Sequence, residues 1–299
     1  MTAETVPPHT GATSTATATA TAARRRPFRG WNPTLTTGVC LLGGLVLTSL
    51  VVTGFGPYSA EDVGNALLGG PTGSHWLGTD NLGRDLFTRT FVAALHSLLV
   101  AFGATTLAAL IGVPIGLLAG YSGRRVDGVL MAVMDIAMSI PSVLLALVLV
   151  SVFTPGTAVL VVGMGLIFVP YFARIVRAPA LTVRERDFVS AARIAGVRPP
   201  VIIGRHVLPN VLSSALVQYA NTAATCVLVE ASLSYLGLGI QPPTPSWGRM
   251  IFEGQRYMAH DPLLVIVPGI TLAVATAAFG LISDGLQERI DPRGTRRTP

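Results

Sequence analysis

The chain has 299 residues, of which 51% are hydrophobic and only 12% are charged, and its mean hydropathy is +0.60. Soluble globular proteins carry about 25% charged residues. So few charges cannot cover a water-facing surface of this size, and lipid is expected to surround most of the chain. All 21 basic residues are arginine, which excludes chemistry that needs a lysine amine, such as a phosphate-binding loop lysine or a Schiff base. The composition therefore argues against a soluble enzyme.

The amino-terminal part is predicted to be a disordered segment followed by one membrane span. Residues 1–30 are rich in Thr and Ala and end in a cluster of arginines, so they are expected to form a disordered, basic, cytoplasmic segment. Residues 30–60 contain no charge, and the densest apolar part, about 35–55, can cross about 30 Å of hydrocarbon as a helix. We therefore predict a first transmembrane helix within 31–56 and an extracytoplasmic segment over 57–93.

Five further apolar runs predict five further spans, so the fold class is all-α: a polytopic membrane protein with six transmembrane helices. Proline is expected to kink the second of the six spans at Pro114 and the third at Pro141. Together these five runs form a predicted transmembrane core over 94–285, and a cytoplasmic tail over 286–299 follows. The runs lie at about 94–121, 126–153, 158–175, 211–236 and 262–283.

The arginines predict the orientation, because cytoplasmic loops near spans are enriched in basic residues. With the amino terminus inside, 17 of the 21 arginines lie on the cytoplasmic side and 4 on the other. Both termini are therefore expected in the cytoplasm. Because the net charge of +6 follows from this topology, it gives no reason to expect nucleic-acid binding.

The longest cytoplasmic connection is predicted at 179–209, and it has helical signals of its own. Thr182 and Glu185 have the spacing of a capping box, which predicts a helix from about Val183 that ends at Gly196. Two prolines then suit the start of a second short helix that runs to His206 and stops by Pro209. Two other readings stay open for this loop: a basic helix that lies on anionic headgroups, and a DNA-binding helix-turn-helix.

The sequence of this loop resembles the EAA loop of binding-protein-dependent ABC importer permeases. Residues 190–196 read SAARIAG, and HVLP follows at 206–209. The resemblance implies a type I ABC importer permease fold, in which this loop forms a coupling helix that docks on an ATPase subunit. Ser190 stands where the family has Glu, so Glu185 or Asp187 is expected to replace that contact. The implied coupling residues are Glu185, Asp187, Ser190, Ala191, Ala192, Arg193, Gly196, His206, Leu208 and Pro209.

Three further segments narrow the resemblance to the dipeptide, oligopeptide and nickel importers, and to the second of their two permeases. HWLGTDNLGRD at 75–85 is similar to the HPLGTDxLGRD segment of these permeases, with Trp76 in place of Pro. EASLSYLGLG at 230–239 and QPPTPSWG at 241–248 are similar to EASLSFLGLG and QPPxPSWG. Candidate residues for docking an extracytoplasmic binding protein are Trp76, Asp80, Arg84, Asp85 and Trp247. The alternative for the external segment is a lid that closes the outer mouth or packs on the partner permease.

Two acidic residues are expected within spans. Asp135 and Glu230 either line the translocation path or bond to neighbouring helices, because a carboxylate in lipid is costly without water or a partner. The histidines and cysteines show no metal-ligand spacing, so no metal site is predicted.

The sequence thus predicts a permease subunit of an ATP-driven importer in the bacterial inner membrane. The resemblance implies four kinds of partner: a second permease, two ATPase subunits or domains, an extracytoplasmic substrate-binding protein, and membrane lipid. This chain is expected to be no enzyme and to hold no cofactor, because ATP and Mg²⁺ would bind the ATPases. Peptide or nickel is the expected cargo. The alternative is a secondary transporter or channel, whose signature would be relay residues in several spans or inverted repeats.

Overall fold

The computed structural model describes residues 32–141, 144–145, 148, 152–153 and 156–290. In these ranges all regular elements are helices and no β-strand forms, and a single isolated bridge joins Thr79 and Asp85. The helices are α1 Pro33–Phe55, α2 Leu86–Tyr121, α3 Arg124–Met138, α5 Thr157–Arg184, α6 Asp187–Ile194, α7 Pro199–Ile202, η1 (a π-helical turn) Ile203–Val207, α8 Leu208–Tyr235, α9 Trp247–Gly254, η2 (a 3-10 turn) Gln255–Tyr257 and α10 Leu263–Ile290.

Five of these helical segments are long and apolar enough to cross a membrane: α1, α2, α5, α10 and the continuous segment Pro199–Tyr235. The all-helical class is confirmed, and the five segments correspond to predicted spans one, two, four, five and six. Only the first half of the third predicted span is described as a named helix, α3, and much of residues 142–155 lies outside the described residues. The count of six therefore stays a prediction. Helix α3 ends at Met138, before Pro141, and residues 142–143 lie outside the described residues, so the expected kink at Pro141 stays a prediction.

Helix α2 begins eight residues before the predicted span. Its N-cap is Asp85, whose Oδ2 accepts hydrogen bonds from the backbone N–H and the hydroxyl of Thr88, both at 2.8 Å. An N-cap carboxylate stabilises the helix start by satisfying a free amide there. With 36 residues, α2 is about 54 Å long. It therefore extends well beyond the hydrocarbon at its ends.

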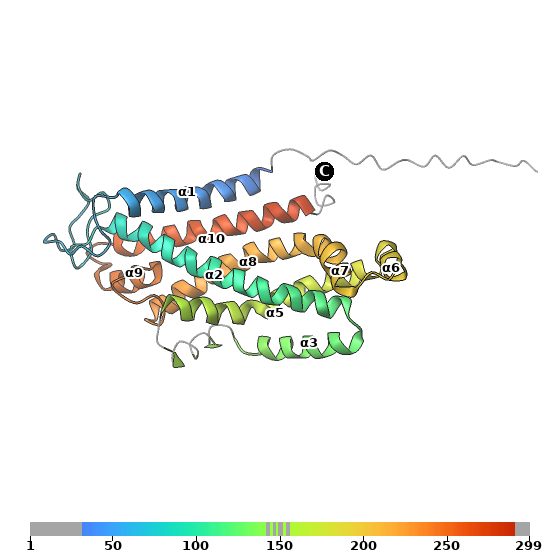
Figure 1. The fold of residues 1–299 in the computed structure, drawn as a ribbon. Helices are drawn as coiled ribbons and strands as arrows, with labels where there is room; N and C mark the ends of the chain where they lie inside the picture. Colours follow the sequence, from blue (N-terminus) through green and yellow to red (C-terminus); the bar gives the residue numbers. More distant parts are fainter. Residues whose placement is uncertain (1–31, 142–143, 146–147, 149–151, 154–155, 291–299) are drawn as a thin grey trace, which may run out of the picture. The chain divides into compact units, whose positions relative to one another are not determined.

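The helices α2, α5 and α8 pack together at the centre, with α1 and α10 beside α2 and α8 and with α3 beside α5 (Figure 1). The contact between α2 and α5 is the closest, because glycines repeat every four residues along α2. A Cβ added at Gly112, Gly116 or Gly120 would lie 2.4 to 2.6 Å from atoms of α5. Small residues at such spacing allow two helix backbones to approach closely in a membrane.

Replacing Gly116 by Val is expected to destabilise the bundle by about 1–3 kcal/mol or more, because overpacking forces the helices apart. The nearest atom to the new Cβ is the backbone oxygen of Ala173, which cannot move alone. Thermal unfolding of the protein in detergent measures the effect. Gly43→Val is the matched control, since a Cβ at Gly43 meets nothing within 4 Å. Equal unfolding temperatures for the two variants would contradict the close packing.

One end of the bundle gathers the segments that were predicted to be cytoplasmic. Asn32 donates from Nδ2 to the Gly285 oxygen and to Glu288 Oε2, both at 3.0 Å, so the start of α1 meets the end of α10. The turn between α2 and α3 and the loop with α6 lie at the same end, and the segment between α1 and α2 lies at the other (Figure 1). This arrangement agrees with the distribution of the arginines.

Candidate functional site

The first candidate site is the loop between α5 and α8, whose first residues extend α5. Helix α5 runs to Arg184, and the hydroxyl of Thr182 bonds back to the Ala178 oxygen within it at 3.4 Å. The predicted capping box is therefore wrong, and Glu185 pairs instead with Arg184. Helix α6 begins at Asp187, after a sharp change of direction, with no side-chain cap.

The predicted end of α6 at Gly196 is confirmed. Gly196 has φ of +77°, its N–H donates to the Arg193 oxygen, and the N–H of Val197 donates to the Ala192 oxygen. This pair of bonds is the Schellman motif, which favours glycine because the residue directly after the C-cap needs a left-handed backbone. The turn fixes the direction in which the chain returns toward the bundle.

The chain then stays helical into α8, so the predicted stop at Pro209 is wrong. A proline inside a helix lacks a donor, and its ring clashes with the carbonyl four residues earlier. Here the π-helical turn η1 precedes the proline, and the N–H of Leu208 bonds to the oxygen of Ile203, five residues back. A single widened turn of this kind accommodates an extra residue within an α-helix. Pro209 itself lies in the first turn of α8.

Helix α6 has an inward and an outward face. Val189 is fully buried, and Ala192, three residues later, packs on the same cluster as Ile202, Val207 and other apolar residues beneath the loop. The opposite face carries four exposed residues at helical spacing. These four form what we call the outward face of α6: Asp187, Ser190, Ala191 and Ile194. Of these, Ile194 is 88% exposed, which is unusual for an isoleucine.

The predicted coupling residues thus separate into three groups. Asp187, Ser190 and Ala191 belong to the outward face of α6. Ala192, His206 and Leu208 are partly buried, and Ala192 and Leu208 pack against the cluster beneath the loop. Ala191 and Ala192 were both implied as coupling residues, but of the two only Ala191 faces outward. Glu185, Arg193, Gly196 and Pro209 are exposed but lie off the outward face.

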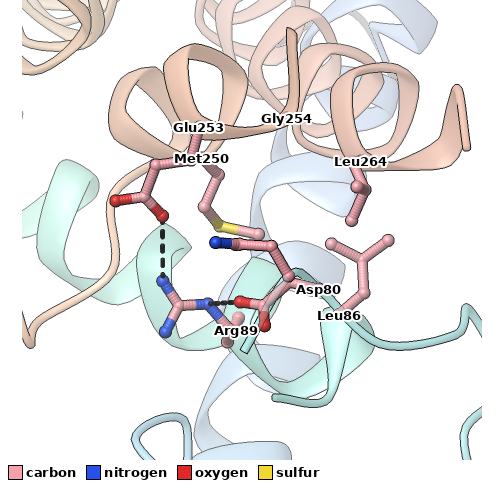
Figure 2. A pocket seen from close by; sticks show the side chains of 8 residues that line it. Asp80, Leu86, Arg89, Met250, Glu253, Gly254 and Leu264 are labelled. Carbon is pink, nitrogen blue, oxygen red and sulfur yellow. Dashed lines mark ion pairs between the residues drawn. The ribbon is translucent and has the colours of Figure 1, made fainter. Parts of the chain in front are cut away.

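At the opposite end of the bundle, buried charges hold the segment before α2 against α9. The guanidinium of Arg89, which is 3% exposed, lies between Asp80 and Glu253 (Figure 2). Its Nε is 3.3 Å from Asp80 Oδ2, and its Nη1 donates to the Ala60 oxygen at 2.9 Å. Arg84 also binds Asp80, at 2.7 Å, and Glu253, at 3.4 Å. Paired charges satisfy one another where isolated ones would be costly.

The enclosed space between these residues is about 10 Å³, with Met250 and Leu264 among its lining residues (Figure 2). A cavity of this size holds one water molecule at most. The pocket is therefore the interior of a structural network, which we call the outer network: Asp80, Arg84, Arg89 and Glu253. It contains no room for a cargo molecule.

Two more predicted docking residues are also internal. Asp85 caps α2, and its Oδ1 lies 2.9 Å from His75 Nδ1; Trp247 donates from Nε1 to the Thr90 oxygen at 3.0 Å. Trp247 is fully buried. The expectation that Asp80, Arg84, Asp85 and Trp247 form a docking surface is therefore corrected: their side chains shape the outer end from within. Trp76, at 67% exposure, is the predicted docking residue that reaches the surface.

The two acids predicted in spans have different surroundings. Asp135 on α3 forms an ion pair with Arg174 on α5, and both side chains are about half exposed, at 56% and 55%. Asp127 and Arg177 make a second ion pair between the same helices, with Arg177 Nη2 and Asp127 Oδ2 2.6 Å apart. This second pair was not predicted from the sequence. Of the two roles considered for Asp135, these bonds support the packing of neighbouring helices.

Glu230 is fully buried on α8, near the outer end. Its Oε1 accepts a 2.6 Å hydrogen bond from the hydroxyl of Ser234, which itself accepts from the N–H of Ile240. This chain of bonds connects α8 to the turn that follows it. The surroundings again support packing as the role of Glu230. Among the described residues, no group of three or more His, Cys, Asp or Glu could hold a metal ion.

Comparisons with known proteins agree with this arrangement. The profile of the family described as binding-protein-dependent transport system inner membrane component matches residues 112–296. The dipeptide transport system permease protein DppC of Alkalihalophilus pseudofirmus is 36% identical over 85% of this chain and 86% of its own length. The glutathione transport system permease protein GsiD of Pectobacterium atrosepticum is 35% identical over 90% and 92%.

Solved structures show the same fold at low identity. An inward-facing structure of the MetNI methionine ABC transporter matches with a TM-score of 0.55 and 18% identity, over 64% of this chain and 91% of that one. An amino acid ABC transporter crystallised with histidines matches with a TM-score of 0.51 and 18% identity, over 68% and 94%. Neither match is a secondary transporter or a channel.

Proposed function

This chain belongs to the family of binding-protein-dependent transport system inner membrane components and is a permease subunit of an ABC importer; from this premise we propose its partners and its cargo. It pairs with a second, similar permease, and the path for the cargo lies between the two. Two ATPase subunits or domains bind at the cytoplasmic end, and an extracytoplasmic binding protein delivers the cargo at the other. Both termini are then cytoplasmic.

The cargo that we propose is a short peptide. Support comes from the relatives, since one carries dipeptides by name and another carries glutathione, a modified tripeptide. The binding protein selects the peptide, and this chain provides the route. No residue of the chain acts as a catalyst, and ATP with Mg²⁺ binds the ATPase partners.

The outward face of α6 is the single observation that carries the ATPase assignment. A short helix that exposes Ile194 and Ala191 at the end of a membrane bundle offers an apolar surface that water does not favour. A groove on each ATPase would cover this surface. When ATP closes the ATPases, α6 moves with its groove, and the permeases change from inward-facing to outward-facing because the closed ATPases bind that state better.

Asp187 replaces the acidic residue that the family has at position 190. It is exposed, and it lies three residues before Ser190 on the same face of α6, so its carboxylate reaches the same partner surface. Glu185 is the weaker candidate, since it precedes α6 and pairs with Arg184. Asp187 also suits the first turn of the helix, where a negative charge is favourable.

For the binding protein, the proposed docking surface surrounds Trp76. The outer network favours the interpretation as a preformed surface and disfavours that as a mobile lid, because the buried pairs fix the segment before α2 against α9. Trp76 packs edge-on against Phe87, which orients the exposed ring. An exposed, oriented tryptophan is typical of residues that dominate protein interfaces.

The test is purification and reconstitution of the complete transporter. An affinity tag on this chain should recover a second permease and ATPase subunits from native membranes in mild detergent, as identified by mass spectrometry. In proteoliposomes with the binding protein outside and ATP inside, a labelled dipeptide should accumulate, and it should not without ATP. A chain that purifies alone, or uptake that follows an ion gradient without ATP, would contradict the assembly. Accumulation of Ni²⁺ in place of the peptide would contradict the cargo.

A further inference from the structure

Two arginines of the coupling region converge on the short turn between α2 and α3. The turn consists of Tyr121, the last residue of α2, followed by Ser122 and Gly123. From the end of α5, Arg184 donates through Nη1 to the Ser122 oxygen at 2.7 Å. From the last turn of α6, the Arg193 guanidinium carbon lies 5.0 Å from the centre of the Tyr121 ring, and Nε donates to the Tyr121 hydroxyl at 3.3 Å.

Both contacts have a clear physical basis. The last carbonyl groups of a helix lack partners and carry partial negative charge, so a guanidinium at the C-terminus of α2 is favourable. The face of an aromatic ring is also negative, and it attracts a cation placed over it. Arg184 therefore fastens the turn to α5, which belongs to the bundle, whereas Arg193 fastens it to α6, which protrudes from the bundle.

The two sides of α6 reach the bundle by different routes. Val189 and Ala192 pack into the apolar cluster that includes Leu117 of α2, Val176 of α5 and Val211 of α8. Arg193 reaches the turn that joins α2 to α3. Because Arg193 is exposed, its contact with Tyr121 adds little to the stability of the fold. It does, however, join the protruding helix directly to the turn between α2 and α3.

We propose that Tyr121 is the positioning residue through which movement of α6 reaches the turn between α2 and α3. The inference rests on the proposed function, because it requires that an ATPase move α6. The apolar cluster carries the same movement to α2, α5 and α8. Loss of the Tyr121 contact should then leave the ATPases bound and active, while the change of the permease between its two states becomes inefficient.

The experiment compares variants of Tyr121 in the complete complex in proteoliposomes. Tyr121→Leu removes the ring and the hydroxyl, and it should lower the rate of ATP-dependent peptide uptake by roughly tenfold, within the range seen for residues that couple distant sites. Stimulation of ATP hydrolysis by the loaded binding protein should fall with it. Basal ATP hydrolysis and recovery of the ATPases should stay unchanged, and the unfolding temperature should fall only slightly, because Leu keeps an apolar side chain against the cluster on which Tyr121 packs. Tyr121→Phe keeps the ring face under Arg193 and should restore most of the uptake.

A double-variant cycle separates this contact from a general effect at either residue. If Arg193 acts on the bundle through Tyr121, then Arg193→Leu combined with Tyr121→Leu should transport no worse than the poorer single variant. Additive losses would contradict the coupling between them.

Three other results would overturn the inference. Wild-type uptake and stimulation in Tyr121→Leu would show that the contact transmits nothing. Loss of the ATPases from Tyr121→Leu would show that Tyr121 serves docking. A fall in peptide uptake in Tyr121→Phe as large as that in Tyr121→Leu would show that the ring is not what matters. A wild-type complex without ATP-dependent uptake would instead overturn the proposed function, and this inference with it.

Discussion

Ala191→Trp is expected to abolish peptide uptake and to release the ATPase subunits from the complex. The Ala191 side chain is exposed on the outward face of α6, between Asp187 and Ile194. An indole there prevents close approach of a partner groove but touches nothing in this chain. We therefore expect the unfolding temperature of the permease to stay the same, while at least nine-tenths of the ATPase is lost on purification, a change of about 1.4 kcal/mol or more in docking.

Two controls make this result specific. Gly44→Trp adds the same ring to an exposed part of α1 where a Cβ meets nothing within 4 Å, and it should keep the ATPases and the uptake. Ala192→Trp places the ring on the inward face of α6, against the apolar cluster, so it should lower the unfolding temperature as well. ATPases that stay bound to Ala191→Trp would exclude the outward face as the docking surface.

Arg89→Leu is expected to lower the free energy of unfolding by about 3–5 kcal/mol, because it leaves buried charge without its partner. Arg89 is 3% exposed, and it contacts Asp80, Glu253 and the Ala60 oxygen. Without the guanidinium of Arg89, the Arg84–Glu253 pair is left to join the segment before α2 to α9 within the outer network, and the Ala60 carbonyl loses its donor. Uptake should fall with stability, since the surface around Trp76 would no longer be held in place.

The measurement is denaturant unfolding of the purified permease in detergent, followed through tryptophan fluorescence. Arg256→Leu is the matched control, because Arg256 is exposed and contacts only the ring of Phe252 among its described interactions, so its loss should change stability by less than about 0.5 kcal/mol. Arg89→Lys should be intermediate, since an ammonium cannot span Asp80 and Ala60 as a planar guanidinium does. Equal stability of Arg89→Leu and Arg256→Leu would mean that the outer network does not hold the segment.

The membrane helices could be predicted because lipid requires long apolar segments, and the sequence shows them directly. The start of α2 could not be predicted, since charged residues such as Arg84 and Arg89 are typical of a solvent-exposed loop. They become part of a folded outer end only through Asp80 and Glu253. Glu253 lies far along the chain, and no local pattern indicates that it meets Arg89. The same holds for Asp135, whose charge was noticed but whose partner Arg174 depends on how α3 packs against α5.

In the coupling loop, the sequence indicated the turn at Gly196 better than the start of the helix. A left-handed position has few candidates besides glycine, so its signal is strong. The spacing of Thr182 and Glu185 was misleading, because Thr182 lies within α5, which continues to Arg184. Extending a helix by a few residues costs little free energy compared with starting a new one. The separation of Ala191 from Ala192 follows from helical periodicity once the burial of Val189 is known.

Helix α2 connects the two ends of the molecule without interruption. It begins at Asp85 beside the outer network, and it ends at Tyr121 beneath α6. Over its length of about 54 Å, a rigid tilt of about 5° would displace one end against the other by roughly 5 Å. The binding protein and the ATPase would then act on opposite ends of the same lever, so that delivery of cargo outside and closure of the ATPases inside become a single mechanical event.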